Sequence, residues 1–123
     1  MQVLFMSRHP DGAHLRDFAE RRLRFVLRRL AWLVVHAKVR LADDNGGRGG
    51  VDKRCHIELK TDGMPVVVAT SLGTDWRVAI NAALSRAAGV LVRRWRRGVR
   101  RSVRAELQSV HRSFIQILIS PTP

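Results

Sequence analysis

Arginine dominates the chemistry that this sequence can carry out. The chain has no acidic residue between Asp75 and Glu106. The same stretch contains Arg77, Arg86, Arg93, Arg94, Arg96, Arg97, Arg100, Arg101 and Arg104. A guanidinium group is a planar fork of donors that grips phosphate bidentately and stacks on bases. The stretch therefore indicates a partner that presents many phosphates.

The arginines of this stretch follow a helical spacing. At 100° per residue, one stripe about 60° wide contains five of them, and at about 1.5 Å rise the stripe is roughly 27 Å long. These five are Arg86, Arg93, Arg97, Arg100 and Arg104. Ala82 and Gly89 leave the helix surface bare near the start of the stripe, so that a sugar-phosphate chain can approach closely. We predict that the stripe binds nucleic acid.

A sixth candidate, Arg22, belongs to an earlier helical segment. It lies near the edge of the apolar arc, so its stem should lie along the core while its guanidinium emerges at the edge. This position predicts that Arg22 projects into the groove between two helices. Simple snorkelling of a long side chain explains the same pattern equally well.

The overall charge agrees with a polyanionic partner. The chain has 23 Lys and Arg against 10 Asp and Glu, a formal charge of +13 with a sequence pI near 11.8. Only Lys38, Lys53 and Lys60 are lysines. A solvated basic face or a membrane-surface helix is the alternative. Nucleic acid is favoured because the sequence beyond Trp95 is basic on almost every face rather than half apolar.

Residues for catalysis or metal binding form no recognisable set. The five histidines, His9, His14, His36, His56 and His111, have no paired metal-ligand spacing. Cys55 alternates with Ile57 and Leu59, which is typical of a small buried hydrophobe, and a reactive thiol beside Arg54 is the alternative. We therefore expect no enzyme activity, no cofactor, no metal and no small-molecule substrate.

Two further features of the sequence bear on binding. The loop Asn45–Gly50 is rich in glycine, but it lacks the following helix and the Gly-Lys-Ser/Thr ending of a nucleotide site. Arg48 in the loop, and Lys53 and Arg54 just after it, are candidates for RNA contact from a flexible loop. The alternative is that this segment is a plain exposed hairpin without a binding role. Trp32, Trp76 and Trp95 are able to stack on bases, although packing explains Trp76 better because it lies on a core face.

Length and composition predict one cytoplasmic domain. A chain of 123 residues can bury roughly two-thirds of its unfolded surface in a single core. One cysteine excludes an internal disulfide framework. We expect neither a signal peptide, because the start lacks the charged region and cleavage site, nor a membrane span, because no apolar run approaches about 18 residues.

Hydrophobic periodicity predicts an α+β two-layer sandwich in the order strand, helix, three strands, helix, with a four-stranded sheet and two helices on one face. Strands are expected at residues 2–6, 35–41, 55–59 and 65–70, and helices from 15 to about 32 and from a cap at Thr74 or Asp75. In the strand 35–41, the alternation places Val35, Ala37, Val39 and Leu41 on the inner face. The core face of the second helix is expected to consist of Trp76, Ala79, Ile80, Ala83, Leu84, Ala87 and Leu91. We expect a domain over residues 1–104 and a tail over 105–123. The tail is strand-like from Ser113 to Ser120, and it either extends the second helix through Val110 or frays.

Several segments resemble the ribosome hibernation promoting factors, also called ribosome-associated inhibitors. They are the opening Met1-Gln-Val, Leu15–Leu23, Lys38–Cys55 and, above all, Asp75-Trp-Arg-Val-Ala-Ile-Asn81, which is similar to the start of the family's second helix. The resemblance covers residues 1 to about 100. It implies four strands with two helices on one face, and binding in the decoding channel of the small ribosomal subunit.

The resemblance also bears on single residues. Arg22, Arg86 and Arg93 fall where the family keeps a basic residue for ribosomal RNA. Arg77 replaces a family aromatic, and Gly89 replaces a basic residue, which removes that contact. Long members carry a C-terminal domain that pairs two ribosomes, and the residues after Arg104 are too few and too unlike it for that role.

The hypothesis from the sequence is therefore a translation inhibitor, monomeric when free. It binds the small ribosomal subunit and its RNA during stress or stationary phase, and blocks the tRNA and mRNA sites. The alternative is a general RNA- or DNA-binding protein, such as an RNA chaperone, that uses the same stripe without a unique ribosomal site.

Overall fold

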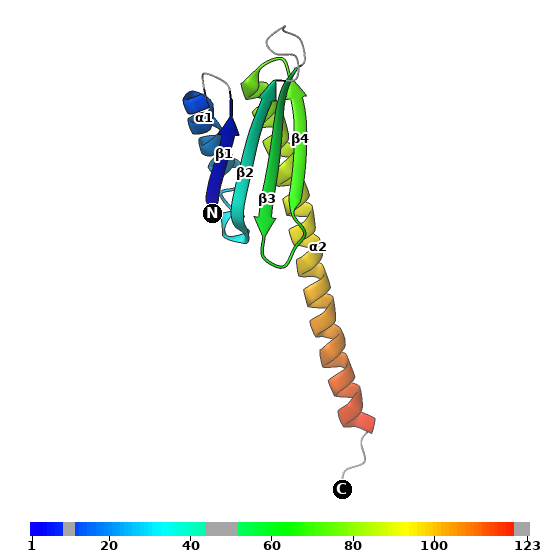
Figure 1. The fold of residues 1–123 in the computed structure, drawn as a ribbon. Coiled ribbons are helices and arrows are strands. Elements are labelled where there is room, and N and C mark those ends of the chain that lie inside the picture. Colours follow the sequence, from blue (N-terminus) through cyan, green and yellow to red (C-terminus); the bar gives the residue numbers. More distant parts are fainter. Residues whose placement is uncertain (9–11, 44–51, 120–123) are drawn as a thin grey trace. The chain divides into compact units, whose positions relative to one another are not determined.

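The computed structural model describes residues 1–8, 12–43 and 52–119, with side chains described as far as Arg112 in the last helix. The elements follow the predicted order (Figure 1): β1 (Gln2–Ser7), α1 (Gly12–Val26), β2 (Val34–Asp43), β3 (Lys53–Thr61), β4 (Val67–Gly73) and α2 (Trp76–Ile119). A short 3₁₀ helix, Ala31–Leu33, precedes β2. The predicted α+β fold class is confirmed.

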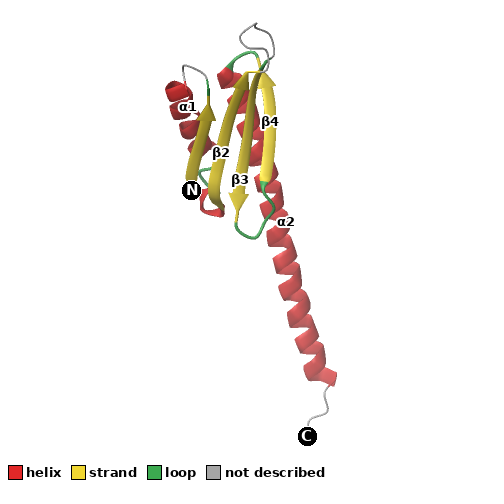
Figure 2. Ribbon diagram, viewed as in Figure 1, coloured by secondary structure: helices red, strands yellow, loops and turns green. Residues whose placement is uncertain are grey.

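The four strands form one sheet in the order β1-β2-β3-β4 (Figure 2). β1 pairs with β2 in parallel, because α1 carries the chain back across the sheet between them. The pairs β2–β3 and β3–β4 are antiparallel and form the predicted meander. Gly63, in the turn after β3, has a φ of 76°, a conformation that glycine adopts without a Cβ clash.

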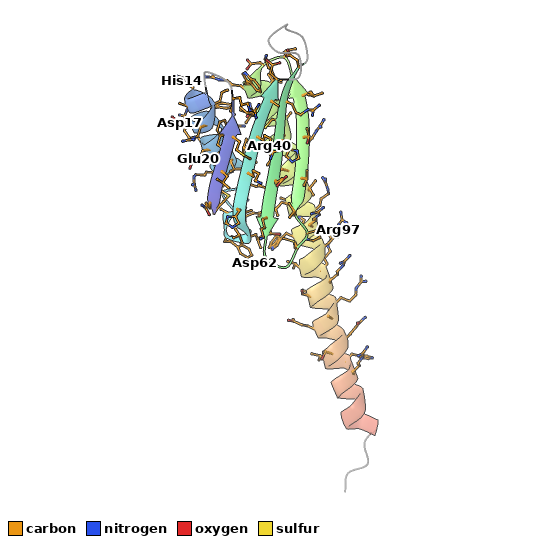
Figure 3. The ribbon with its side chains drawn as sticks, in the orientation of Figure 1. His14, Asp17, Glu20, Arg40, Asp62 and Arg97 are labelled. Carbon is orange, nitrogen blue, oxygen red and sulfur yellow. The ribbon has the colours of Figure 1, made fainter. Side chains whose placement is uncertain are left out.

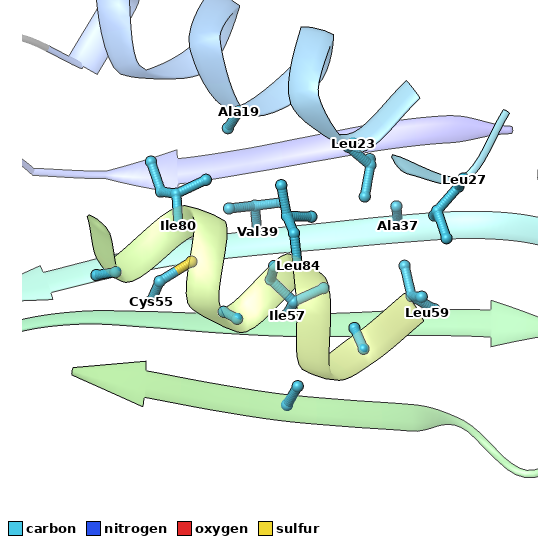
Figure 4. Packing of buried hydrophobic residues seen from close by; sticks show 14 of the residues in the cluster. Ala19, Leu23, Leu27, Ala37, Val39, Cys55, Ile57, Leu59, Ile80 and Leu84 are labelled. Atoms are coloured by element: carbon cyan, nitrogen blue, oxygen red, sulfur yellow. The ribbon is translucent and has the colours of Figure 1, made fainter. Parts of the chain in front are cut away.

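The core lies between the inner face of the sheet and both helices (Figure 4). α1 contributes Ala19 and Leu23, while Ile57 and Leu59 point inward from β3. All seven residues predicted for the core face of α2 are buried: Trp76, Ala79, Ile80, Ala83, Leu84, Ala87 and Leu91. Cys55 is buried in the same cluster, as its alternation predicted.

The start of β2 departs from the predicted alternation. Val35 was expected on the inner face, but it is exposed and Val34 is buried instead. The pairing of β2 with β3 shifts register between Val34 and His36, as in a β-bulge. An extra residue in a strand moves the side chains on one side of the irregularity to the opposite face of the sheet. The predicted inner face is therefore wrong at Val35 and correct from Ala37 onward.

The first helix ends earlier than the predicted Trp32. After Val26 the turns of the backbone are tighter than those of an α-helix. The Leu30 N–H donates to the Leu27 carbonyl at 2.8 Å, and the Leu33 N–H donates to the Leu30 carbonyl at 2.9 Å. These three-residue spacings replace the four-residue spacing of an α-helix. Apolar periodicity alone does not distinguish the two, because leucines at positions 27, 30 and 33 satisfy both.

Asp75 caps α2, as predicted. Its Oδ1 accepts a hydrogen bond from the Arg77 N–H at 2.9 Å, which satisfies one of the unpaired donors at the helix start. The helix then continues to Ile119, so the strand-like interpretation of Ser113–Ser120 is wrong as far as Ile119. No Gly or Pro interrupts that segment before Pro121, and a β-branched run alone does not decide between strand and helix.

The chain forms two compact units, Met1–Val92 and Arg93–Pro123. All the residues of the hydrophobic core belong to the first unit. Every residue from Arg96 to Arg112 in the second unit is exposed.

Truncation after Arg104 should leave the fold intact, because Ala105–Arg112 are exposed and the core closes at Leu91. We expect the melting temperature at low salt to change by no more than a few degrees, since surface changes away from special features are usually within about 0.5 kcal/mol. Thermal denaturation of the full chain and of the 1–104 variant tests this. A large fall would show that the segment 105–123 docks on the first unit.

Candidate nucleic-acid interface

Arg22 lies where the two helices of the first unit meet. Its Nε donates a hydrogen bond to Asn81 Oδ1 of α2 at 3.0 Å, and its guanidinium carbon lies 5.7 Å from the centre of the Phe25 ring. The side chain is half-buried rather than extended into water. The predicted position in the groove between the helices is confirmed, and Arg22 is fixed there by a contact with each helix.

Arg86 occupies the other flank of α2. Its Nη1 donates a hydrogen bond to the backbone carbonyl of Thr70 in β4 at 2.9 Å, and the residue is exposed. Asn81 and Arg86 are separated by about 140° around the helix axis at 100° per residue. The structure therefore places Arg22 and Arg86 on opposite flanks of α2 and does not bring them together.

The remaining four predicted residues, Arg93, Arg97, Arg100 and Arg104, are all exposed in the second unit. Figure 3 labels Arg97 there. Glu106 is the only acidic residue from Arg93 to Arg112, so little in this segment neutralises the arginines. Their common stripe remains a prediction for RNA contact, supported by this exposure and charge.

The second unit also has an apolar face, which the sequence interpretation missed. Val99, Val103, Leu107 and Val110 are 42%, 49%, 65% and 67% exposed. Spacings of four, four and three residues place them on one side of the helix. At 100° per residue these four side chains occupy an arc about 80° wide, Arg96 falls within it, and the arginine stripe is centred about 100° further round the helix. Beyond Trp95 the helix is therefore basic on most sides and also has a narrow apolar side next to the arginine stripe.

The outer face of α1 is less available for phosphate than its arginine content suggests. Arg24 forms an ion pair with Glu20 at 3.0 Å, and Arg21 Nε donates to the Asp17 carbonyl at 3.3 Å. Asp17, Glu20 and His14 lie along this side of the helix (Figure 3). The carboxylates partly cancel the positive charge, so this face is a natural comparison surface for the stripe on α2.

A basic surface that sequence reasoning did not single out lies on the open face of the sheet, where no helix packs. Its basic side chains are Lys38, Arg40, Arg54 and Lys60, from the two central strands (Figure 3 labels Arg40). Leu4 and Met6 border it on β1, and Val68 and Leu72 border it on β4; all four are exposed. The alternation of β2 and β3 contained the signal, since every second residue is polar or charged.

One acidic residue interrupts this open face. Glu58 lies 3.1 Å from His56 Nε2 and 3.9 Å from Lys38 Nζ, and the hydrogen bond from His56 holds the pKa of Glu58 below its ordinary value. The other ring nitrogen of His56 is 2.8 Å from Thr70 Oγ1. The carboxylate is therefore ionised and shared between two basic groups near neutral pH.

Of the loop residues considered for RNA contact, Lys53 is not available. Its Nζ lies 2.5 Å from Asp43 Oδ2 and 3.7 Å from Asp52 Oδ1, and the hydrogen bond to Asp43 raises the pKa of Lys53. Arg54 is exposed on β3, while Arg48 and the glycine-rich loop lie outside the described residues. The two carboxylates offset the charge of Lys53 and compete with a phosphate for its ammonium group.

The tryptophans have different exposures. Trp76 is 8% exposed in the core, which confirms packing as its role, and Trp95 is half-buried. Trp32 is 71% exposed, and its indole N–H donates to the Arg29 carbonyl at 3.0 Å. Only Trp32 presents most of its surface to solvent.

Cys55 has the environment of an inert thiol. Burial raises its pKa to about 12, so at pH 8 about one molecule in 10,000 carries the thiolate. We expect an aromatic disulfide reagent to leave the native protein unlabelled over minutes and to label it at once in denaturant. Fast labelling of the native protein, measured by absorbance, would favour the alternative of a reactive thiol beside Arg54.

Neither a metal cluster nor a membrane-spanning helix is found within residues 1–8, 12–43 and 52–119. No group of three or more His, Cys, Asp or Glu side chains there is placed to hold a metal ion. No helix in the same ranges is long and apolar enough to cross a bilayer.

Fold and surface together define a small basic α+β domain with an arginine-rich second helix. No family model matches the sequence, and no curated protein does. The fold is shared with the N-terminal domain of Protein Y from Thermus thermophilus, with a TM-score of 0.60 and 23% identity over 76% of this chain and 98% of that domain. It is also shared with a ribosomal subunit interface protein from Coxiella burnetii, with a TM-score of 0.62 and 12% identity over 76% and 96% of the two chains.

Both structures come from the ribosome hibernation factor family, which is the family that the sequence resembles. At these identities the likeness establishes the fold, and the fold implied by the resemblance is thereby confirmed.

Proposed function

We propose that this protein is a hibernation-type factor that binds the small ribosomal subunit and inhibits translation by occupying the decoding channel, where tRNA and mRNA would bind. The observation that carries the proposal is the fold, shared with a ribosomal subunit interface protein, in a chain of formal charge +13. The action is steric and electrostatic. It needs no cofactor and no catalytic group.

The exposed arginines of α2 supply the affinity in this proposal. Arg86, Arg93, Arg97, Arg100 and Arg104 contact phosphates of the ribosomal RNA, and Arg22 contributes from the groove between the helices. Each neutralised phosphate releases condensed counterions, so binding weakens steeply as salt increases. Expression in stress or stationary phase and a monomeric free protein belong to the same proposal.

Sedimentation with ribosomes from starved cells tests the proposal directly. The tagged protein should co-sediment with the small subunit, and excess bulk RNA should not release it. The bound protein should also compete with tRNA for the subunit. Absence from every ribosomal fraction would refute ribosome binding.

A general RNA- or DNA-binding protein is the second candidate, and the diffuse charge favours it. Basic residues occur on α2 and also on the open face of the sheet, so phosphate contact is possible from more than one side. In that case, bulk RNA of any sequence would displace the protein from ribosomes in proportion to its concentration.

A further inference from the structure

Exposed aromatic rings are found together with arginines at the C-terminal end of α1. Among the described residues, Phe25 and Trp32 are the two aromatic side chains that are more than half exposed, at 55% and 71%. Both lie within eight residues of sequence, in the segment that ends α1 and leads to β2. Large exposed rings are costly in water and mark interaction sites more often than small apolar residues do.

The arginines of this segment are already arranged around a ring. The Arg28 guanidinium carbon lies 4.5 Å from the centre of the Phe25 ring, and that of Arg22 lies 5.7 Å from it. Arg28 is also held by a 2.8 Å hydrogen bond from its Nη1 to the Phe25 carbonyl. Guanidinium planes beside an aromatic ring are the groups on which an unstacked nucleobase rests.

Trp32 is held in a defined position although it is exposed. Its indole N–H donates to the Arg29 carbonyl at 3.0 Å, which restricts ring rotation. The side chain has therefore lost part of its rotational freedom before any ligand binds, so that binding costs less conformational entropy. Such a ring serves as a stacking platform at low entropic cost.

We infer that Phe25, Arg28 and Trp32 form a stacking site for an unpaired nucleobase of RNA. The site adjoins Arg22, which contacts Phe25 and reaches Asn81 of α2. This inference rests on the proposed function and adds to it a preference for unpaired over duplex RNA. The arginines argue for a nucleic acid rather than for a protein surface, because no acidic residue lies between Glu20 and Asp43 to offset them.

The test uses Trp32→Ala, Trp32→Phe and a control variant, Val78→Ala, which shortens an exposed apolar side chain that belongs to none of the basic surfaces described above. Affinity is measured at several salt concentrations for small ribosomal subunits, for a 12-nucleotide single-stranded RNA and for a duplex of the same length. Trp32→Ala should weaken binding to the single strand and to the subunit about 5- to 150-fold, the range for one lost base stack. Trp32→Phe should retain most of the affinity, and Val78→Ala should bind like the wild type.

The salt dependence separates stacking from phosphate contact. Trp32→Ala should leave the slope of log affinity against log salt unchanged, because a stacked base releases no counterions. The single strand should quench the tryptophan fluorescence of the wild type more than the duplex does, and Trp32→Phe should lose that quenching.

Wild-type affinity of Trp32→Ala for the single strand would overturn the inference. So would a loss of subunit binding with unchanged RNA binding, which would assign Trp32 to a protein contact. Neither outcome affects ribosome binding by the wild type, so the proposed function is tested separately.

Discussion

Replacing Arg86 and Arg93 by alanine should sharply reduce affinity for the small ribosomal subunit. Each arginine is exposed on α2 and contributes a phosphate contact in the proposed function. The slope of log affinity against log salt should fall by up to about one unit per arginine, because each lost contact retains counterions on the RNA. Subunit binding measured between low and physiological salt, together with inhibition of translation, tests this.

The matched control is the double replacement of Arg21 and Arg24 by alanine. It removes the same charge from the outer face of α1, where Arg24 is already paired with Glu20. Binding should change much less than in the α2 variant. If both doubles weakened binding and inhibition equally, the interaction would be a diffuse charge effect, and the general nucleic-acid binder would become the better proposal.

Folding of the α2 variant must be checked in the same experiment. We expect the free energy of unfolding to change by less than about 1 kcal/mol, because both side chains are exposed and α2 packs through other residues. Urea denaturation gives this value. A loss of affinity accompanied by unfolding would not count as evidence for a phosphate contact.

The largest effect on stability is expected from Ile80→Ala. Ile80 is 0% exposed and lies on the face of α2 that covers the sheet, in the same buried cluster as Cys55 (Figure 4). The substitution removes buried methyl groups and leaves a cavity, which costs about 2–5 kcal/mol in well-packed cores. A fall in the urea midpoint with an unchanged m-value would confirm it.

Val78→Ala is the control for this substitution. Val78 lies two residues away on the same helix but is 54% exposed, so its truncation should change the free energy of unfolding by about 0.5 kcal/mol or less. Equal effects of the two substitutions would show that α2 does not pack on the sheet through the face described.

The hydrophobic periodicity of the sequence made the core residues predictable. The errors in the predicted fold occur where local backbone geometry, rather than periodicity, decides the structure. The face of α2 is buried at every predicted position because alanines and leucines recur at helical spacing from Trp76 to Leu91. The end of α1 was misplaced because leucines satisfy α and 3₁₀ spacing alike. Val35 was misplaced because a register shift depends on the pairing of two strands, which one strand's pattern does not contain.

The candidate site was predictable in its residue types more than in its arrangement. Arg22 is in the predicted groove, and the arginines of α2 are exposed as expected. That Arg22 and Arg86 lie on opposite flanks depends on which neighbour each side of α2 meets, α1 through Asn81 or β4 through Thr70. Sequence spacing fixes angles around a helix axis but does not identify the element on each side.

The hydrogen bond from Arg86 to the Thr70 carbonyl has a consequence for solubility. β4 is an edge strand, and the unpaired carbonyls of an edge can template pairing with another chain. A charged side chain laid against that edge occupies one of these acceptors and puts a positive charge where a second strand would approach. We therefore expect Arg86 to disfavour edge-to-edge pairing at this point of β4, an effect that is not expected of Arg93 in the second unit.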